Sequence, residues 1–552
     1  MLLFSYLESY VFTLKKRILL AIIRIRFLNC KKGTGKMIGN VHARPAWESL
    51  ILLCVGMLSA AAAHAAAPWS DTPVTCHWIG AVRAGSSTYG AYASWTNAEN
   101  WAEGIVPGMY IKDGVTNGCP GCTAVFDRAC DYQAADFITG PNETPLISIS
   151  NIVVSSAAVP QIFIGRSASP YFMFERNGGL SVGGDVVTAP TVSSYWFLRG
   201  SVNTTTTLKF ENNSATPLVM NNFKGPDTAF AASAGTMVLA MRGSGDIRAD
   251  GNYTRSRYTL RISLGMSGGK FIQNKDATVD YIRTEAGVGL QHLEIPSGKT
   301  LTIPEAAMPL IAESDVLVDG GGACHFSAAA DKAAVIGVAS GKTLTLDCGI
   351  TRTAGGRFQI GHGSYSGGTV VLAPGRSFGN AQVDFYSGTL QLPSNETFTS
   401  AITIPSSRRG TIAGGTLGEA KLAGGVSGTT RPLTLKGKLA IASSVTASTT
   451  AADDAEISFR KVDSDATAFT ISSLTLDGDK TIPVEDGVTA TISAIDNNGY
   501  KLDIRPSGTG KVLFPGLSVG HAPEWLTLNG APARISDDGE LLSPSGMCVI
   551  FR

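Results

Sequence analysis

Histidines and neighbouring aspartates are the residues of this chain whose chemistry would suit the cleavage of sugar chains. His362 lies between two glycines, and the pairs Asp453-Asp454 and Asp537-Asp538 supply adjacent carboxylates. Glycoside hydrolysis needs one carboxyl group as an acid and a second as base or nucleophile. These residues do not combine into one motif, and neither a serine-nucleophile motif nor a metal-binding histidine spacing accompanies them. We therefore interpret His362 as a turn residue and predict no catalytic residue, metal site or cofactor.

Six cysteines have a spacing that is compatible with disulfides: Cys76, Cys119, Cys122, Cys130, Cys324 and Cys348. The first four could form two disulfides in any of three pairings, or hold one zinc ion through four thiolates. We favour disulfides because the chain carries an export signal, described below, and exported proteins meet an oxidising environment. The last two cysteines are 24 residues apart, about one repeat of the chain, so they could stack or bond across neighbouring repeats.

The repeats are the elements that must position any such residues. Gly368–Pro374 reads GTVVLAP, and twenty residues later Gly388–Pro393 reads GTLQLP. Each copy opens at a glycine, alternates apolar with polar residues, and stops at a proline, as a short strand does. Because so short a strand cannot bury its apolar side alone, a recurring unit of this size implies stacking on its neighbours. The pattern predicts an all-β fold, a parallel β-helix or β-solenoid.

Sequence repeats with longer spacings extend this pattern over residues 131–520, which we assign to the solenoid body. SGKTLTI at 297–303 returns as SGKTLTL at 340–346, a spacing of 43 residues. Leu-Thr-Leu at 433–435 returns at 474–476, a spacing of 41 residues. Both spacings are about twice twenty, so we interpret each as two coils of the solenoid.

The N-terminus has the features of an export signal. Residues 50–63 form an apolar run that is followed by an Ala-x-Ala cleavage site ending at Ala65. The run is too short for a comfortable membrane span, and it is typical of a signal-peptide core. We assign residues 37–65 to the signal peptide and residues 1–36 to a basic extension that a start at Met37 would remove. The protein is thus expected to be exported.

Composition supports a folded extracellular chain and argues against nucleic acid as a partner. The 552 residues include 63 glycines, are 44% hydrophobic and only 16% charged, which suits short strands joined by tight turns. Formal net charge is +1, but residues 1–65 hold nine Lys and Arg against two acids. The remainder is therefore mildly acidic, and it offers no electrostatic reason to bind a phosphate backbone.

Residues 66–130 carry a tryptophan-rich signature that comprises Trp78, Gly80, Trp95, Asn100, Trp101, Gly104, Pro107, Phe126 and Asp127. This signature resembles the opening module of secreted proteins with autotransporter-associated β-strand repeats. The resemblance implies a passenger-like β-solenoid behind the module. The chain departs from that family by an insertion at 81–93, and no translocator barrel follows the passenger. A solenoid exposes an open end that must be covered, so we expect residues 66–130 and 521–552 to be its two caps.

The leading interpretation is an exported β-solenoid with a structural or adhesive role and no catalysis. We expect it to be secreted or on the cell surface, with the periplasm as an alternative, and to have no stable membrane span after signal removal. Its partners would be extracellular glycans or surface proteins. Two alternatives remain open. In a β-helix polysaccharide lyase or glycoside hydrolase, charged side chains would meet in one groove. In a non-catalytic glycan-binding rod, exposed aromatic residues would lie in a line along the coils.

Overall fold

A computed structural model shows that the chain divides into two units, residues 1–66 and 67–552. The first unit, which includes the predicted basic extension and signal peptide, lies outside the described residues. The structure describes residues 69–544 except 88–89, 113–114, 129, 131–133, 137–145, 156–161, 165–170, 188, 199–204, 225–234, 252, 255–258, 305–308, 328–331, 354, 429–430 and 462–466.

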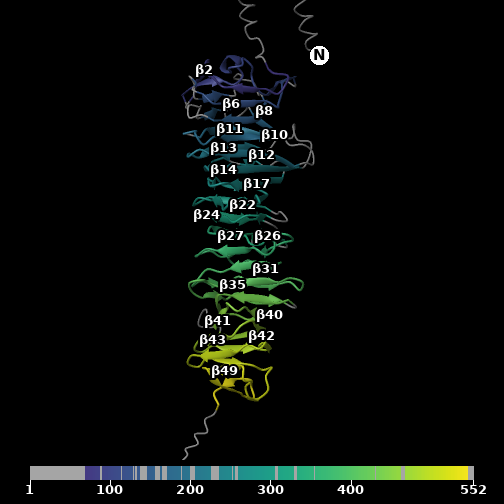
Figure 1. Ribbon diagram of the computed structural model, residues 1–552, viewed down its shortest axis with the longest axis vertical. Helices are drawn as coiled ribbons and strands as arrows, with labels where there is room; N and C mark the ends of the chain where they lie inside the picture. The colour runs from purple at the N-terminus through teal and green to yellow at the C-terminus, as the bar shows by residue number, and fades with distance from the viewer. Residues whose placement is uncertain are drawn as a thin grey trace, which may run out of the picture. The chain divides into compact units, whose positions relative to one another are not determined.

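The second unit is a stack of coils (Figure 1). The strand pairings show that each regular coil contributes one strand to each of three faces. The first face contains β14 (Thr236–Gly243), β17 (Thr259–Met266), β20 (Tyr281–Thr284), β23 (Leu310–Ala312), β26 (Ala333–Val338), β29 (Arg357–Ile360), β31 (Gln382–Phe385), β34 (Ile402–Ile404) and β37 (Val426–Gly428). The second face contains β15 (Ile247–Ala249), β18 (Phe271–Gln273), β21 (Gln291–Glu294), β24 (Val316–Asp319), β27 (Thr343–Leu346), β30 (Thr369–Leu372), β32 (Thr389–Gln391), β35 (Gly410–Ala413) and β38 (Leu433–Lys436).

The third face is divided between two sheets. The first sheet contains β19 (Ala277–Thr278), β22 (Thr300–Ile303), β25 (Ala323–Phe326) and β28 (Gly349–Arg352). The second contains β33 (Thr397–Phe398), β36 (Ala420–Leu422), β39 (Lys438–Ile441), β41 (Glu456–Phe459), β43 (Lys480–Val484), β46 (Leu502–Pro506) and β49 (Leu526–Leu528). Neighbouring strands on each of these faces run parallel, as consecutive coils of a solenoid must.

Towards the N-terminus, the first face continues through β1 (Thr75–His77), β6 (Thr123–Phe126), β8 (Leu146–Val154), β10 (Tyr171–Val182) and β12 (Thr205–Asn212). The neighbouring elements are β2 (Arg83–Ser87), β3 (Gly90–Ser94), the 3₁₀ turn η1 (Ala98–Asn100), β4 (Met109–Lys112), β5 (Val115–Gly118), β7 (Ala134–Asp136), β9 (Ile162–Ile164), β11 (Thr191–Leu198), β13 (Leu218–Lys224) and β16 (Tyr253–Thr254). Towards the C-terminus lie β40 (Val445–Ala451), β42 (Ala468–Leu476), β44 (Thr489–Ile492), β45 (Ile495–Asp496), β47 (Lys511–Leu513), β48 (Gly520–His521), β50 (Ala531–Pro532), β51 (Arg534–Ile535) and β52 (Leu541–Leu542).

Antiparallel pairs occur at both ends of this stack. Strand β2 pairs with β3, and β4 pairs with β5, among the first described residues. Among the last, β49 pairs with β50, and β51 pairs with β48 and β52. The fold class predicted from the sequence, a parallel β-solenoid with a tryptophan-rich module at its N-terminal end, is confirmed.

The core consists of columns of apolar side chains that point into the coils. Leu344, Val370 and Leu390 are directly in register on the second face, and all three are fully buried. Each fully buried side chain of this size contributes about 1.5–3 kcal/mol relative to an exposed one. Outward positions of the same strands, such as Thr343, Thr369 and Thr389, are half-buried, so alternation along each strand separates the core from the surface.

The register tests the interpretation of the repeats. Thr369 pairs with Thr389, so the twenty-residue echo is one coil, as predicted. The 41-residue echo is two coils, because Leu433 pairs with Thr449 and Thr449 with Leu474. The 43-residue interpretation is wrong, since 300–303 form β22 on the third face and 343–346 form β27 on the second. A strand on any face with a buried inner side can alternate apolar and polar residues in this way. Segments with nearly identical sequences therefore need not lie on the same face.

The alternation predicts unequal effects for two neighbouring substitutions in β32. Leu390→Ala removes a fully buried side chain and should lower the free energy of unfolding by about 2–5 kcal/mol. Thr389→Ala, its outward neighbour, should change it by less than about 0.5 kcal/mol. Denaturant unfolding of both variants measures the difference, and equal losses would contradict the assignment of inner and outer sides.

Candidate functional site

The outer side of the first face carries arginines that lie against tyrosine rings. We call the six residues the tyrosine–arginine stripe: Arg261, Tyr281, Arg283, Tyr365, Tyr386 and Arg408. The guanidinium carbons lie 5.8, 5.5 and 3.5 Å from the ring centroids in the pairs Arg261–Tyr281, Arg283–Tyr365 and Arg408–Tyr386. A cation over an aromatic face is stabilised by the ring quadrupole. The strands from β17 to β34, or the turns that follow them, supply all six side chains.

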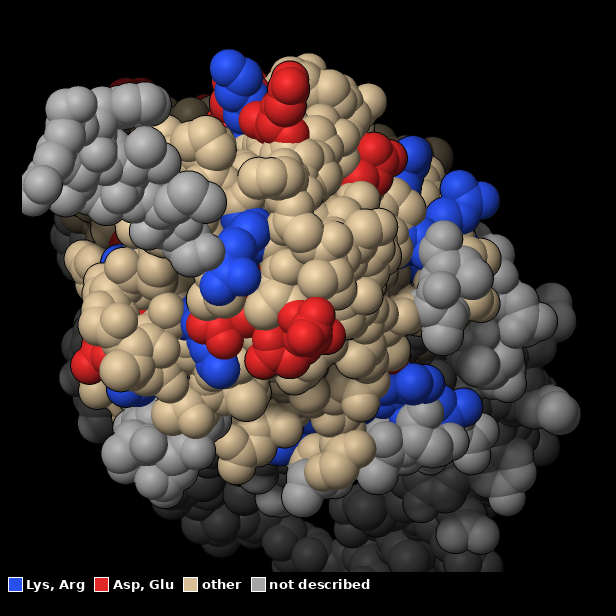
Figure 2. Space-filling view, turned by 90° about the horizontal axis from the view of Figure 1, so that it is seen from below, with Lys and Arg blue, Asp and Glu red and all other residues tan. Residues whose placement is uncertain are grey.

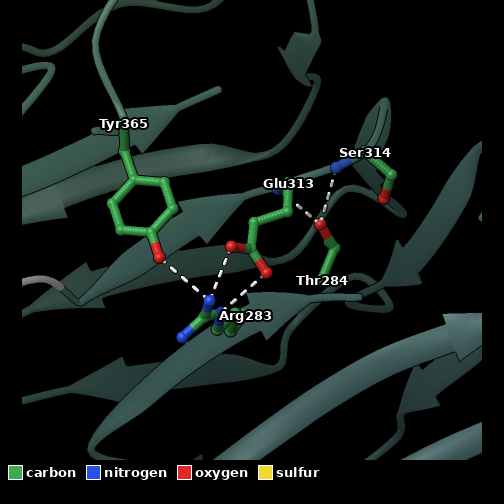
Figure 3. A network of polar contacts seen from close by, with 5 residues as sticks. All are labelled: Arg283, Thr284, Glu313, Ser314 and Tyr365. Atoms are coloured by element: carbon green, nitrogen blue, oxygen red, sulfur yellow. Dashed lines mark hydrogen bonds and ion pairs between the residues drawn. The ribbon is translucent and has the colours of Figure 1, made fainter. Parts of the chain in front are cut away.

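Arg283 is the centre of the polar network drawn in Figure 3. Its Nε donates to Glu313 at 2.9 Å, and its Nη2 donates to the other Glu313 oxygen at 2.5 Å. The same Nη2 donates to the Tyr365 hydroxyl at 2.9 Å. The bond from Arg283 lowers the pKa of the Glu313 carboxyl, and the bond to Glu313 raises the pKa of Arg283. A bidentate ion pair of this kind is held more rigidly than an ion pair with a single hydrogen bond.

Thr284 fixes the turn that presents Glu313. The Thr284 hydroxyl accepts hydrogen bonds from the backbone N–H groups of Glu313 at 2.8 Å and Ser314 at 3.0 Å (Figure 3). Thr284 is itself almost fully buried, so this hydroxyl is anchored in the coil below the turn. The carboxylate of Glu313 is therefore aimed at Arg283 by the backbone as well as by charge.

Glycines leave space for long side chains that cross between coils. A Cβ at Gly337 would lie 2.8 Å from the Cβ of Tyr365, so this glycine makes room for the tyrosine that reaches Arg283. Gly265 stands between Arg242 and Glu285 in the register, and a Cβ there would lie 2.6 Å from the Glu285 carboxylate. Arg242 donates to Glu285 at 3.0 Å over this gap.

Arg408 differs from the other stripe arginines in its surroundings. Its guanidinium carbon lies 3.5 Å from the Tyr386 ring centroid, and the exposed ring of His362 lies 5.2 Å from the same tyrosine. The side chain of Gln359 contacts His362 at 3.3 Å. In the part of the chain that the structure describes, Arg408 takes part in no ion pair. Its positive charge is thus held in place by aromatic contact instead of by a carboxylate.

Several charged side chains on the other faces are paired with each other. On the second face, His292 contacts Asp319 at 2.8 Å and Lys270 contacts Glu294. On the third face, Arg505 contacts Asp503 at 2.7 Å. Seen from the end that lies lowest in Figure 1, acidic and basic side chains lie beside one another among larger uncharged areas (Figure 2).

The structure brings the aromatic residues of the predicted signature together in one cluster. Trp78, Trp95, Trp101 and Phe126 are fully buried, and neighbouring ring centroids lie 4.7–6.4 Å apart. The indole N–H of Trp95 donates to the Pro107 carbonyl at 3.2 Å. Interlocked aromatic rings of this kind contribute beyond their buried area, so the cluster closes the end of the apolar core.

Polar and glycine positions of the signature shape the chain around these rings. Asn100 is fully buried; its side chain accepts from the Val82 N–H at 2.7 Å and donates to the Ser94 carbonyl at 2.9 Å. Gly80 and Gly104 have φ of 53° and 64°, a left-handed conformation that favours glycine. Asp127 contacts His77 at 2.7 Å and Arg128 at 3.0 Å. Every signature residue therefore has a structural position in the cap.

The disulfides predicted from cysteine spacing are not formed among the described residues. Cys76, Cys119, Cys122, Cys324 and Cys348 are thiols. Cys130 lies beside Gly80. The thiols of Cys324 and Cys348, whose spacing would let them stack or bond across neighbouring coils, share a hydrogen bond that raises the pKa of Cys324 and lowers that of Cys348. Burial raises the pKa of Cys76 to about 12, so this group is a protonated core residue.

Residues considered for catalysis do not meet. Asp453 and Asp454 lie beside Lys480, whose Nζ donates to the Asp453 carbonyl at 2.7 Å, whereas His362 lies against Tyr386. Within the described ranges, no group of three or more His, Cys, Asp or Glu side chains is arranged to hold a metal ion. No described helix has the length and apolar character needed to cross a membrane.

Sequence reasoning did not identify the stripe. Tyr281 and Arg283 are two residues apart in one strand, a spacing that does place both on one side. Arg283 and Tyr365, however, are 82 residues apart, and only the coil register brings them together. Comparison of the chain with protein-family models, curated proteins and solved structures gives no match.

The lowered pKa of Glu313 predicts a pH-dependent contribution to stability. A carboxyl whose pKa is lower in the folded state stabilises the fold above its unfolded value, here 4.5, and this contribution is lost as the pH falls through the folded value. Thermal unfolding of the wild type and Glu313→Gln should differ at neutral pH and converge in acid. A difference that is constant across this range would contradict the assigned role of the ion pair.

Proposed function

We propose that this chain is an exported, passenger-like β-solenoid with a structural or adhesive role at the cell surface or outside the cell. The observation that carries the proposal is the cap: Trp78, Trp95, Trp101 and Phe126, separated in sequence, meet in one buried cluster at the start of a three-faced stack. This is the arrangement expected of the resemblance to proteins with autotransporter-associated β-strand repeats. A chain with such a cap can present a long, regular outer surface to partners.

The electrostatics of the outer faces favour a non-catalytic role over the polysaccharide lyase or hydrolase alternative. A general acid for glycoside cleavage needs a raised pKa, so that it holds a proton at neutral pH. Arg283 instead lowers the pKa of Glu313, and the backbone N–H of Thr509 lowers that of Asp486. These carboxylates are kept ionised and act as acceptors for neighbouring groups.

The tyrosine–arginine stripe favours the third interpretation, a glycan-binding rod, as the form that an adhesive role would take. Its rings and guanidinium groups come from five of the seven coils between β17 and β34, and the coils of β23 and β26 contribute none. Aromatic side chains and arginines are enriched at binding surfaces because they offer large contact areas with little loss of conformational entropy. The stripe is therefore the surface that we propose for contact with extracellular glycans.

Export is tested by the fate of the N-terminus in cells that produce the full chain. The expected result is a protein outside the cytoplasm whose first residue is Ala66, identified by mass spectrometry of its N-terminal peptide. A matched variant, Leu53→Arg, breaks the apolar run and should leave an uncleaved chain inside. An uncleaved wild-type chain in the cytoplasm would contradict the proposal.

Catalysis is tested by incubating the purified chain with neutral and acidic polysaccharides. We expect no release of reducing ends and no unsaturated sugar products, because carboxyls such as Glu313 and Asp486 have lowered pKa values and hold no proton for a leaving group at neutral pH. Steady release of either product, abolished by boiling, would overturn the non-catalytic role.

A further inference from the structure

We propose that the Arg408–Tyr386 end of the tyrosine–arginine stripe binds acidic glycans, that is, sugar chains that carry carboxylate or sulfate groups. The inference rests on the proposed adhesive role and adds the chemical class of ligand to it. It begins from a contrast between Arg408 and the arginines around it.

The positive charge of Arg408 is available to a ligand. Arg283, Arg357 and Arg460 each contact a carboxylate, Glu313, Asp384 and Glu419 respectively. Arg408 contacts no acidic side chain among the described residues, and the next residue, Arg409, is exposed. Two neighbouring guanidinium groups without an acidic partner are the feature that an anion requires.

The guanidinium of Arg408 is also oriented in advance. It lies 3.5 Å over the Tyr386 ring, and the turn that carries it is closed by a hydrogen bond from the Arg408 N–H to the Pro405 carbonyl at 2.8 Å. Contact with Tyr386 restricts the position of the guanidinium, and no ion pair among the described residues uses its N–H groups, which a carboxylate or sulfate could bind. Such pre-orientation reduces the entropy lost on binding, and a fork of two N–H donors matches these anions.

The surroundings of Arg408 suit a sugar better than a small inorganic anion. Tyr386 is partly exposed, and His362 and Gln359 extend the same surface from the preceding coil. These groups offer aromatic contact for apolar sugar faces and hydrogen bonds for hydroxyl groups. An isolated anion would use the charge but none of this adjoining surface.

A second stripe arginine extends the site along the stack. Arg261 lies over Tyr281, and its buried Nε donates to no described group. β17 and β34 are six coils apart on the first face, which is about 29 Å at the usual strand spacing. Arg283 lies between them and is paired with Glu313, and Arg261 also acts on that carboxylate, since it lowers the pKa of Glu313. Arg261 therefore adds only a partly compensated charge, and a long glycan chain can reach both it and Arg408.

The test measures binding of the full chain to immobilised polygalacturonate, heparin and neutral dextran. We expect binding to at least one acidic glycan, weakened by salt, and none to dextran. Arg408→Ala should weaken that binding about tenfold or more, as expected for loss of a charge-assisted contact. Arg505→Ala, which removes an equal charge from the third face, should leave it unchanged. Equal thermal unfolding of the two variants confirms that both are folded.

Several results would overturn the inference. Equal binding by wild type and Arg408→Ala, comparable binding to dextran, or no binding to either acidic glycan would each do so. Carboxylated and sulfated ligands are distinguished by which of the two acidic glycans is retained. If the chain is exported and adheres to cells but binds no acidic glycan, this inference alone fails. If it degrades the glycans, the proposed non-catalytic role fails instead.

Discussion

Stacking of one coil on the next is the interaction on which the whole structure depends. A strand such as β30 has four residues, and its inward side chains Val370 and Leu372 are buried only because coils lie above and below. No coil has enough apolar surface to fold alone, so stability accumulates between neighbours. The same constraint leaves the outward positions free to vary. Polar residues and functional groups can therefore be placed there without disturbing the core.

The ends of the stack are where this constraint is hardest to satisfy. A terminal coil has a partner on one side only, and its open strand edges could pair with another chain. At the N-terminal end, antiparallel hairpins and the buried cluster of Trp78, Trp95 and Trp101 replace the missing neighbour. Among the last described residues, short antiparallel strands such as β50 and β51 follow the parallel strands. The change from parallel to antiparallel pairing thus marks where the repeats stop.

The sequence predicted the class of fold because the inward alternation is local and repeated. It predicted one coil from the echo at Thr369 and Thr389, since these lie on the same face. It misassigned the sequence repeat at Leu301 and Leu344 to one face. The sequence of a strand shows that one of its sides is buried, but it does not show which face of the solenoid the strand joins. The stripe was missed for a similar reason. Contacts such as Arg283 with Tyr365 depend on the summed lengths of intervening turns, which no local pattern encodes.

The glycine gaps have a mechanical consequence. Because Gly265 lets Arg242 reach Glu285, and Gly337 lets Tyr365 reach Arg283, these ties connect coils that are not adjacent. When a stack held at one end is pulled, coils would otherwise peel away singly. A side-chain contact between coils that are not adjacent causes the coils between its two ends to unfold together. When this region is unfolded by force, it should therefore unfold in steps larger than one coil. The length of chain released in each step depends on where Gly265 and Gly337 allow side chains to connect distant coils.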